Sequence, residues 1–420
     1  MSTIPLSRPC LGQPEELAVQ EVLRSGWVTQ GPRVAEFERA FAEFTGARHA
    51  CAVSSGTAAL HLALRAVGVG PGDVVLTVSH SFIATANAIR HCQAEPVFVD
   101  VDAETCNLCP AALERTLERD FERRGDVHWY RDLARLAVGE SPLCGRQTEC
   151  GRLAALLVVH QLGMPADLGR LLPIARQYGL PVVEDAACAV GSRIRLGDVW
   201  EPIGRPHGDV ACFSFHPRKV LTTGDGGMLC TNEPRHDQRF RLWRQHGMSV
   251  SDALRHRAAT VIVEHYATTG YNYRLTDLQA AVGIEQLKRL PAMLDRRREL
   301  ADAYAQALAD CPALELPREP SYASSNWQSY AVRLRDPRRQ PLVMQALLDR
   351  GISTRRGVMC AHLEAPYATA WPAGSLPASV QARDRGLMLP LFPDMSAGDV
   401  QRVADSLRDV LDRSHHATAA

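Results

Sequence analysis

Short apolar runs alternate with stretches of helical spacing from about residue 48 to 233. This alternation is typical of a parallel sheet wrapped by helices, because each parallel strand needs a long crossover before the next one. Most of the runs are apolar throughout, which indicates strands that are covered on both faces. The expected strands are residues 49–53, 74–78, 96–100, 154–159, 181–186, 209–215 and 227–231.

The chain has 420 residues, which is too long for one small core and predicts two domains. We expect an α/β large domain over 1–290, including the N-terminal segment. Residues 118–150 break its rhythm with an arginine-rich stretch that we interpret as an insertion. We expect a smaller α/β domain over 291–420, which starts in a bridging helix. Within it, 330–334 is expected as a strand and 341–351 and 396–413 as helices.

Composition excludes several classes of protein. Acidic and basic residues balance at 47 each, so nothing predicts binding to nucleic acid. We find neither a signal segment nor an apolar stretch that could span a bilayer, and expect a cytoplasmic protein without membrane contact. The 12 cysteines are scattered and several lie in apolar runs, as reduced cysteines do.

Lysine is rare, since it occurs only at positions 219 and 288. Lys219 follows an expected strand and precedes a glycine-rich turn, and clefts in α/β sheets form at such strand ends. A lysine that forms an imine needs a neutral amine, which nearby positive charge from Arg218 or His216 would favour. The alternative is an ordinary surface lysine, which is how we interpret Lys288.

A second motif, SSGTAALHLAL at 54–64, joins a strand end to a helix start. Gly56 allows close backbone approach and Thr57 opens the helix, so free N–H groups and a hydroxyl face an anion there. A simple helix cap by Ser55 or Thr57 is an equally good interpretation.

Asp185 closes an apolar strand in VVEDAACAVGS, where a carboxylate is poorly solvated without a partner. A protonated ring nitrogen of a cofactor is one suitable partner. A metal ion or a helix N-terminus would be others.

Five motifs occur in the order found in one known family. They are SSGTAAL, HSFIATANAI, VEDAACAVGS, FSFHPRKVLTTGDGGM and GYNYRLTDLQAAVGIEQL. Together they resemble the DegT/DnrJ/EryC1/StrS aminotransferases over nearly the whole chain. The resemblance implies the fold type I aminotransferase architecture, with a mostly parallel central sheet wrapped by helices and a smaller C-terminal α/β domain. It also implies pyridoxal 5'-phosphate (PLP) as cofactor and a homodimer with shared active sites.

The resemblance assigns roles to individual residues. By position, Lys219 looks like the lysine that carries PLP as a Schiff base and transfers protons, and Asp185 looks like the partner of the pyridine nitrogen. Phe82 matches the aromatic residue that stacks on the ring. Four residues match phosphate-binding positions: Gly56, Thr57, Ser214 and, across the dimer, Asn272. Phe82 as core, Ser214 as a strand hydroxyl and Asn272 as a turn residue are the alternatives.

Two departures from the family pattern concern the ring and the substrate. Cys188 stands where the family usually has Gln, His or Glu on the cofactor's phenolic oxygen, and a thiol is a weaker hydrogen-bonding group. His362 matches a family histidine in a substrate-facing loop, but RRGVM replaces the more usual His-Tyr. Arg355 and Arg356 suit a nucleotide diphosphate or a carboxylate, or are simply solvated.

The implied reaction moves an amino group from glutamate or glutamine to a keto-sugar, nucleotide-linked by expectation, or to a keto-cyclitol. A family branch that dehydrates sugars carries His in place of the lysine, and Lys219 argues against it. A regulatory protein on the same fold is a further alternative without support in the sequence. The CNLC motif (Cys106 and Cys109), with Cys144 and Cys150, has ligand-like spacing, but it falls at a family turn and we expect no metal.

Overall fold

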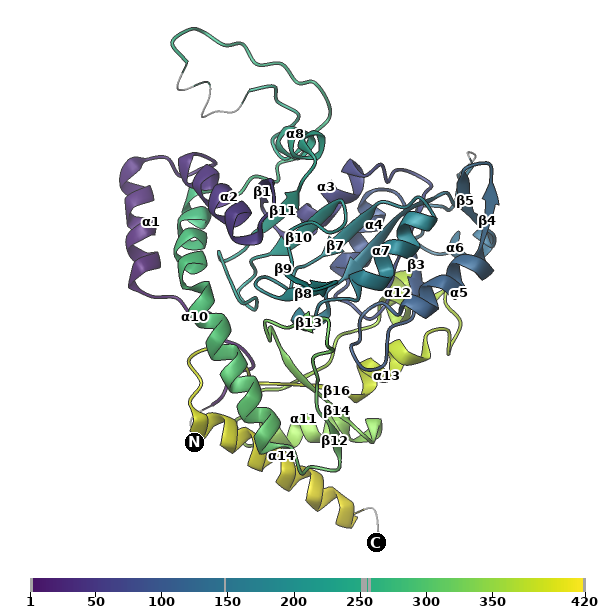
Figure 1. Cartoon of the computed structure of the whole chain (residues 1–420), viewed down its shortest axis with the longest axis vertical. Coiled ribbons are helices and arrows are strands. Elements are labelled where there is room, and N and C mark those ends of the chain that lie inside the picture. The colour runs from purple at the N-terminus through teal and green to yellow at the C-terminus, as the bar shows by residue number, and fades with distance from the viewer. Residues whose placement is uncertain (1–2, 147–148, 251–254, 256–257, 418–420) are drawn as a thin grey trace.

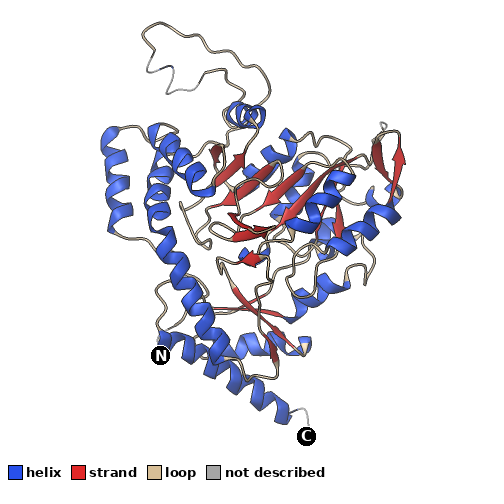
Figure 2. Cartoon of the chain, in the orientation of Figure 1, coloured by secondary structure: helices blue, strands red, loops and turns tan. Residues whose placement is uncertain are grey.

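The computed structural model describes residues 3–146, 149–250, 255 and 258–417. Figure 1 shows a large sheet-containing part, from which the long helix α10 (Asp277–Ala307) runs to a smaller C-terminal part. Helices surround the strands of the large part, as Figure 2 shows.

The central sheet has seven strands in the order β1-β11-β10-β7-β6-β2-β3. Strand β11 is antiparallel to both of its neighbours, whereas the pairs from β10 to β3 are parallel. The strands are β1 (His49–Val53), β2 (Val74–Val78), β3 (Glu95–Val99), β6 (Leu153–Val159), β7 (Val182–Asp185), β10 (Val210–Ser214) and β11 (Gly227–Thr231). The sequence therefore predicts all seven of these strands to within one residue at every end.

Both faces of this sheet are covered, which explains why its strands are apolar throughout. On β10, Cys212 belongs to the apolar cluster under α3 and α8, while Phe213 belongs to the cluster on the opposite face. The first face carries α3 (Gly56–Ala66), α4 (Ala84–His91) and α8 (Pro234–Trp243); the second carries α2 (Pro32–Thr45), α5 (Pro110–Asp120), α7 (Leu168–Gln177) and α10; α1 (Gln13–Ser25) packs on α10.

The predicted insertion at 118–150 contains regular structure. Strands β4 (Phe121–Arg124) and β5 (Val127–Tyr130) form a hairpin, and α6 (Leu133–Leu136) follows. The rings of Phe121 and Tyr130 lie 5.3 Å apart and are buried, so the hairpin is anchored to the core.

The C-terminal part has its own apolar cluster, built on a sheet of order β12-β14-β16-β15. Helix α10 continues through Pro291, and its last turns contribute Leu300 and Tyr304 to this cluster. The elements are β12 (Leu314–Glu315), β14 (Tyr330–Leu334), α11 (Gln340–Leu348), β15 (Arg355–Arg356), α12 (Ala365–Ala368), α13 (Pro377–Arg385), β16 (Gly386–Leu389) and α14 (Ala397–Ala417). The remaining short elements are β8 (Arg193–Leu196), β9 (Val199–Pro202), β13 (Ala323–Ser324) and the 3-10 turns η1 (Gln161–Gly163), η2 (Pro337–Arg339) and η3 (Ala361–Leu363).

The first described residues do not lie where the expected boundaries put them. Ile4 forms a β-bridge with Ile352 and is buried in the C-terminal cluster. The N–H of Leu391 donates to the carbonyl of Leu6 at 3.1 Å. The start of the chain thus packs with the C-terminal part, and the division at residue 290 stays a prediction.

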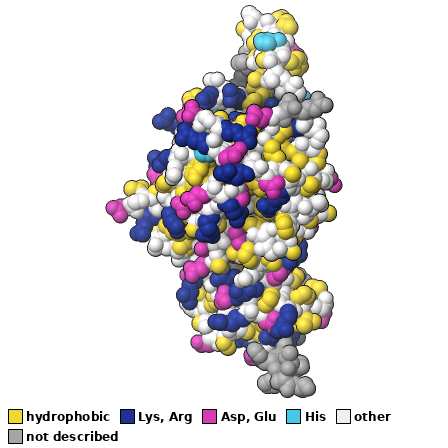
Figure 3. Space-filling model, turned by 90° about the vertical axis from the view of Figure 1, so that its right-hand side faces the viewer, with side chains coloured by type: hydrophobic (Ala, Val, Ile, Leu, Met, Phe, Trp, Pro, Cys, Tyr) yellow, Lys and Arg dark blue, Asp and Glu magenta, His cyan; other side chains and the backbone are white. Residues whose placement is uncertain are grey.

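The surface mixes charges of both signs. Figure 3 shows Lys or Arg side chains interspersed with Asp or Glu side chains over one face. Among the described residues, no helix combines the length and the apolar character that crossing a membrane requires.

Candidate active site

A cavity of about 430 Å³ opens at the carboxyl ends of β7 and β10, beside the N-terminus of α3. Clefts form at such strand ends because the chain leaves neighbouring strands in different directions. We call two groups of its lining residues the sheet side and the C-terminal side. The sheet side comprises Ser55, Gly56, Thr57, Asp185, Cys188, Ser214 and Lys219; the C-terminal side comprises Gln328, Ser329, Arg355, Arg356, Gly357, Val358, Met359, Met388, Leu389 and Leu391.

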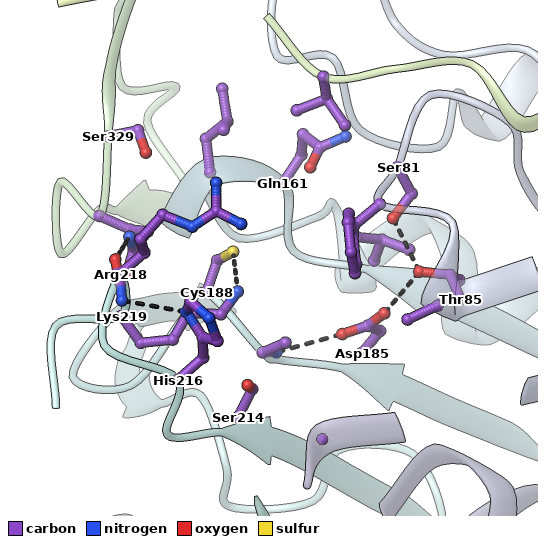
Figure 4. Close-up of a pocket in the computed structure, with 18 of the residues that line it drawn as sticks. Ser81, Thr85, Gln161, Asp185, Cys188, Ser214, His216, Arg218, Lys219 and Ser329 are labelled. Atoms are coloured by element: carbon purple, nitrogen blue, oxygen red, sulfur yellow. Dashed lines mark hydrogen bonds between the residues drawn. The ribbon is translucent and has the colours of Figure 1, made fainter. Parts of the chain in front are cut away.

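Lys219 lies in the cleft, half-buried, in the connection between β10 and β11. Its Nζ donates a hydrogen bond to Cys188 Sγ at 3.1 Å, as Figure 4 shows. Lys288 instead lies on α10 with an exposed side chain, and its Nζ is 2.6 Å from Glu285 Oε1. Of the two lysines, Lys219 alone lines the cleft.

Asp185 is buried at the end of β7 and faces the cleft. Thr85 Oγ1 donates to its Oδ2 at 2.8 Å, and the N–H of Ala187 donates to its Oδ1 at 3.2 Å. Because the Thr85 hydroxyl donates its hydrogen to Asp185, it can only accept from Ser81. The hydroxyl of Ser81, 2.8 Å away, therefore donates to Thr85 Oγ1. These bonds hold the carboxylate in one orientation without neutralising it (Figure 4).

The N-terminus of α3 separates the two interpretations of the SSGT motif. Ser55 is the N-cap residue, and its Oγ accepts from the N–H of Ala58 at 3.1 Å. Thr57 is therefore not the N-cap residue, and it lines the cleft instead. A Cβ added at Gly56 would lie 2.7 Å from Ser214 Cβ, so glycine is needed for the helix to approach β10 this closely.

Phe82 is not a core residue. It lies between β2 and α4 with 58% of its surface exposed, and it lines the cleft. A large apolar ring exposed inside a cleft offers a face for a planar ligand.

Two predicted site residues lie outside the cleft of their own chain. Asn272 is exposed and forms a β-bridge with Gln245. His362 is buried, with its Nδ1 hydrogen-bonded to Ser79 Oγ, and burial lowers the pKa of His362 to about 4. His362 thus ties the C-terminal part to the end of β2, and its predicted contact with a substrate stays a prediction.

Arginines concentrate at the cleft mouth. Arg218, Arg355 and Arg356 all line it, and burial together with the charges of the other two lowers the pKa of Arg355. Arg356 lies 4.0 Å from Glu364, whereas within the described ranges no carboxylate lies within 4.0 Å of Arg218 or Arg355. Such uncompensated positive charge favours an anionic ligand.

A buried hydrogen-bonded pair of side chains, His160 and Glu184, lies next to the sheet side. His160 Nε2 is 3.0 Å from Glu184 Oε2, and His160 Nδ1 accepts from the N–H of Ala166. Burial by itself raises the pKa of Glu184, but the hydrogen bond from His160 and the nearby His207 bring it below its ordinary value. The pair fixes β6 and β7 next to Asp185.

Sequence reasoning missed several lining residues. Ser81, just before α4, and Thr85, in its first turn, flank Phe82 in the sequence and could have been found from that motif. Leu6 and Ser7, near the start of the chain, and Gln161 and Ser329 carry no local signal of a site.

The cysteine motif does not form a cluster in the described chain. Cys106 and Cys109 lie in a turn whose N–H groups donate to the carbonyls of Asp102 and Asp100. No three His, Cys, Asp or Glu residues among those described lie close enough together to hold a metal ion.

Comparisons with known proteins agree over nearly the whole chain. The sequence model of the DegT/DnrJ/EryC1/StrS aminotransferase family matches residues 9–408. The aminotransferase TlmJ from Streptoalloteichus hindustanus is similar at 33% identity with a TM-score of 0.82, over 98% of this chain and 100% of that one. DesV from S. venezuelae is similar at 32% identity and 0.79, over 97% and 98%. DesI, solved in the presence of its TDP-sugar product, is similar at 28% identity and 0.79, over 100% and 95%.

Proposed function

The chain belongs to the DegT/DnrJ/EryC1/StrS aminotransferase family, and we propose that it moves an amino group from glutamate or glutamine to a keto-sugar. The family match confirms the family predicted from the sequence, and the similar solved structures confirm the predicted α/β fold class. The protein is therefore a PLP-dependent aminotransferase. A keto-cyclitol is the second acceptor class that we keep.

One observation carries the proposal. Lys219, the single lysine of the cleft, lies in the same cavity as the buried carboxylate of Asp185 and the N-terminus of α3. An amine, a carboxylate and a helix N-terminus are the three groups that a phosphorylated pyridine aldehyde requires. A lysine in this position also argues for amino transfer over sugar dehydration.

The residues present fit the cofactor. The close approach of Gly56 to Ser214 brings the Ser214 hydroxyl next to the start of α3, and the first N–H groups of a helix have no intrahelical acceptor. We propose that Gly56, Thr57 and Ser214 hold the phosphate. In the same proposal Phe82 stacks on the ring, and Asp185 holds the proton of the ring nitrogen.

When bound, PLP supplies an electron sink for negative charge on the carbon next to the transferred nitrogen. The chain's own residues then have distinct tasks. Lys219 carries the cofactor and, once released from it, moves a proton as general base and acid. Asp185 faces the ring nitrogen, and the hydrogen bonds from Thr85 and the N–H of Ala187 fix the orientation of its carboxyl group.

Cys188 lies beside Lys219 rather than apart from it, since its Sγ accepts from Nζ at 3.1 Å. We propose that this thiol faces the phenolic oxygen of the cofactor in place of the usual amide or imidazole. As a weak donor it stabilises a negative oxygen less well than those groups do.

The arginines at the cleft mouth support an anionic acceptor. We propose that Arg355 and Arg218 meet the diphosphate of a nucleotide-linked sugar, because guanidinium groups pair well with phosphate oxygens. DesI, which is similar to this chain, was solved with a TDP-sugar. Asn272, exposed and outside its own cleft, supports a homodimer in which it reaches the phosphate of the partner's cofactor.

Cofactor attachment tests the proposal first. The purified protein should be yellow, lose its visible band on borohydride reduction, and carry the reduced label on Lys219 alone. Because the chain has one other lysine, peptide mapping distinguishes the two outcomes directly. Labelling at Lys288, or none, would overturn the assignment.

A panel of acceptors tests the substrate class. The protein is first loaded with an amino group from glutamate, excess donor is removed, and each keto compound is offered for a single turnover. Recovery of the visible band with nucleotide-linked keto-sugars, at lower concentrations than with free keto-sugars or keto-cyclitols, supports the proposal. Equal response to free and nucleotide-linked sugars contradicts the role of the arginines.

A further inference from the structure

Lys219 lies in a connection that has no helix or strand of its own, between β10 and β11. Within this connection, the N–H of Lys219 donates to the carbonyl of His216 at 2.8 Å. The direction in which the side chain leaves the backbone depends on the two peptide groups that flank its Cα, which are the carbonyl of Arg218 and the N–H of Val220.

A single side chain from the C-terminal side holds both of these groups. Gln328 Oε1 accepts from the N–H of Val220 at 3.0 Å, and Gln328 Nε2 donates to the carbonyl of Arg218 at 2.5 Å. The amide of Gln328 thus replaces, for Lys219, the pairing that a neighbouring strand would provide. Gln328 is 9% exposed, so water competes little for these two hydrogen bonds.

Gln328 is itself held by its neighbours. Its N–H donates to Asn326 Oδ1 at 2.8 Å, and Asn326 Nδ2 donates to the carbonyls of Cys188 and Val190, both at 2.8 Å. From α10, Arg297 Nη1 donates to the carbonyl of Trp327 at 3.1 Å. The segment before β14 is therefore held by hydrogen bonds both to the turn after β7 and to α10.

The same segment also holds Cys188, the residue that contacts the amine of Lys219. Asn326 binds the carbonyl of Cys188, whose Sγ accepts from Lys219 Nζ. The backbone of Lys219 and the neighbour of its amine thus both depend on residues 326 and 328, more than a hundred residues away in sequence.

We propose that Gln328 is a positioning residue that aims Lys219 at the reacting carbon. The inference rests on the proposed role of Lys219 and adds that a residue of the C-terminal part controls it. Without the amide, the peptides around Lys219 lose their partners and the amine samples other directions. Errors of about 1 Å in the placement of a reacting group cost up to about 100-fold in rate.

Gln328→Met tests the proposal, because methionine keeps the length of the side chain and removes both hydrogen bonds. Gln340→Met is a matched control: Gln340 is 8% exposed and its Nε2 also holds two backbone carbonyls, those of Arg383 and Gly386, but it lies outside the cleft. The two variants lose similar buried bonds in the same part of the chain.

Three readouts are compared between the variants. In the apoprotein, the rate at which an amine-reactive reagent modifies Lys219 is measured against Lys288 of the same molecule. In the protein with PLP, the fraction of Lys219 labelled by borohydride and the pH midpoint of the visible band are measured. With substrates, Gln328→Met should lower kcat about 10- to 100-fold with little change in KM.

Changes in Lys219 reactivity, in the pH midpoint and in kcat for Gln328→Met but not for Gln340→Met support the proposal. If the two variants behave alike in all readouts, Gln328 is structural and the proposal is wrong. If Gln328→Met does not fold, Gln328→Glu, which keeps the acceptor for Val220, is compared in its place with the same criteria. Should wild-type protein fail to label at Lys219, it is the proposed function that fails.

Discussion

The two sides of the cleft differ in how their polar groups are satisfied. On the sheet side, Asp185 already has Thr85 and the N–H of Ala187, and Lys219 has Cys188. On the C-terminal side, Arg355 has no carboxylate within ion-pairing distance among the described residues, and apolar groups such as Met359 and Leu391 surround the space.

This difference suggests which ligand each side is built for. A permanent cofactor is served by groups that are oriented in advance, because orientation on binding costs free energy each time. A substrate that must leave is served by groups whose partner arrives with it. We therefore interpret the sheet side as the cofactor's and the C-terminal side as the acceptor's.

Loss of Lys219 should have the largest effect. Lys219→Ala should lower kcat by about 10³-fold or more, since acid–base catalysis alone contributes about 10²- to 10⁴-fold. Steady-state rates with the acceptor found above measure this. Lys288→Ala is the control and should keep wild-type activity; a similar loss in both variants would break the assignment.

Asp185→Asn should come next. Asparagine keeps the shape but removes the charge, and separating a buried charge pair costs about 3–5 kcal/mol, which corresponds to about 150- to 5,000-fold in kcat. Absorption spectra of the bound cofactor should change as well. Asp225→Asn, at an exposed position on the cleft rim, should leave both unchanged. Equal effects at the two positions would contradict the cofactor role of Asp185.

Arg355→Ala tests the C-terminal side. It should raise KM for a nucleotide-linked acceptor about 10-fold, the value of one charge-assisted hydrogen bond, and should leave the KM of the amino donor unchanged. Steady-state kinetics with each substrate varied in turn measure both values. If the KM of the donor rises instead, Arg355 binds a carboxylate and the comparison between the two sides must be redrawn.

His362→Gln should have the smallest effect on activity, because His362 lies outside the cleft. Its effect is on stability. Burial lowers the pKa of His362 from 6.5 to about 4, so the unfolded state binds the proton more tightly. The stabilisation that this neutral histidine gives is complete above pH 6.5 and decreases, by up to about 1.4 kcal/mol per pH unit, as the pH falls toward 4.

Denaturant unfolding of both proteins at several pH values measures this dependence, which should be weaker in His362→Gln. His216→Gln, a substitution inside the cleft, is the comparison for activity. An increase in acceptor KM for His362→Gln with unchanged stability would restore His362 as a substrate residue.

Patterns in short stretches of the sequence were enough to predict the central sheet and much of the sheet side of the cleft. Apolar runs predict β1 to β11 of the central sheet because both faces are buried, and the rarity of lysine directs attention to Lys219. Asp185 and Thr57 stand at strand or helix ends, where the sequence itself marks a change of structure. The family pattern predicted that Cys188 lies near the cofactor, but only the structure showed that its thiol contacts Lys219.

Contacts between distant segments could not be predicted in this way. Gln328 and Lys219 are 109 residues apart, and Ser79 and His362 are 283 apart, with no periodicity that links them. The same reason explains why the N-terminal residues were expected with the large domain although Ile4 packs with the C-terminal part.

The pairing of Leu6 with Leu391 has a consequence for synthesis of the chain. Leu6 and Ser7 line the cleft together with Met388 and Leu391, which follow them in the chain by more than 380 residues. Until the segment around Leu391 has been made, the central sheet can form but the cleft lacks part of its wall. The cleft is therefore completed only after every strand of the central sheet is present.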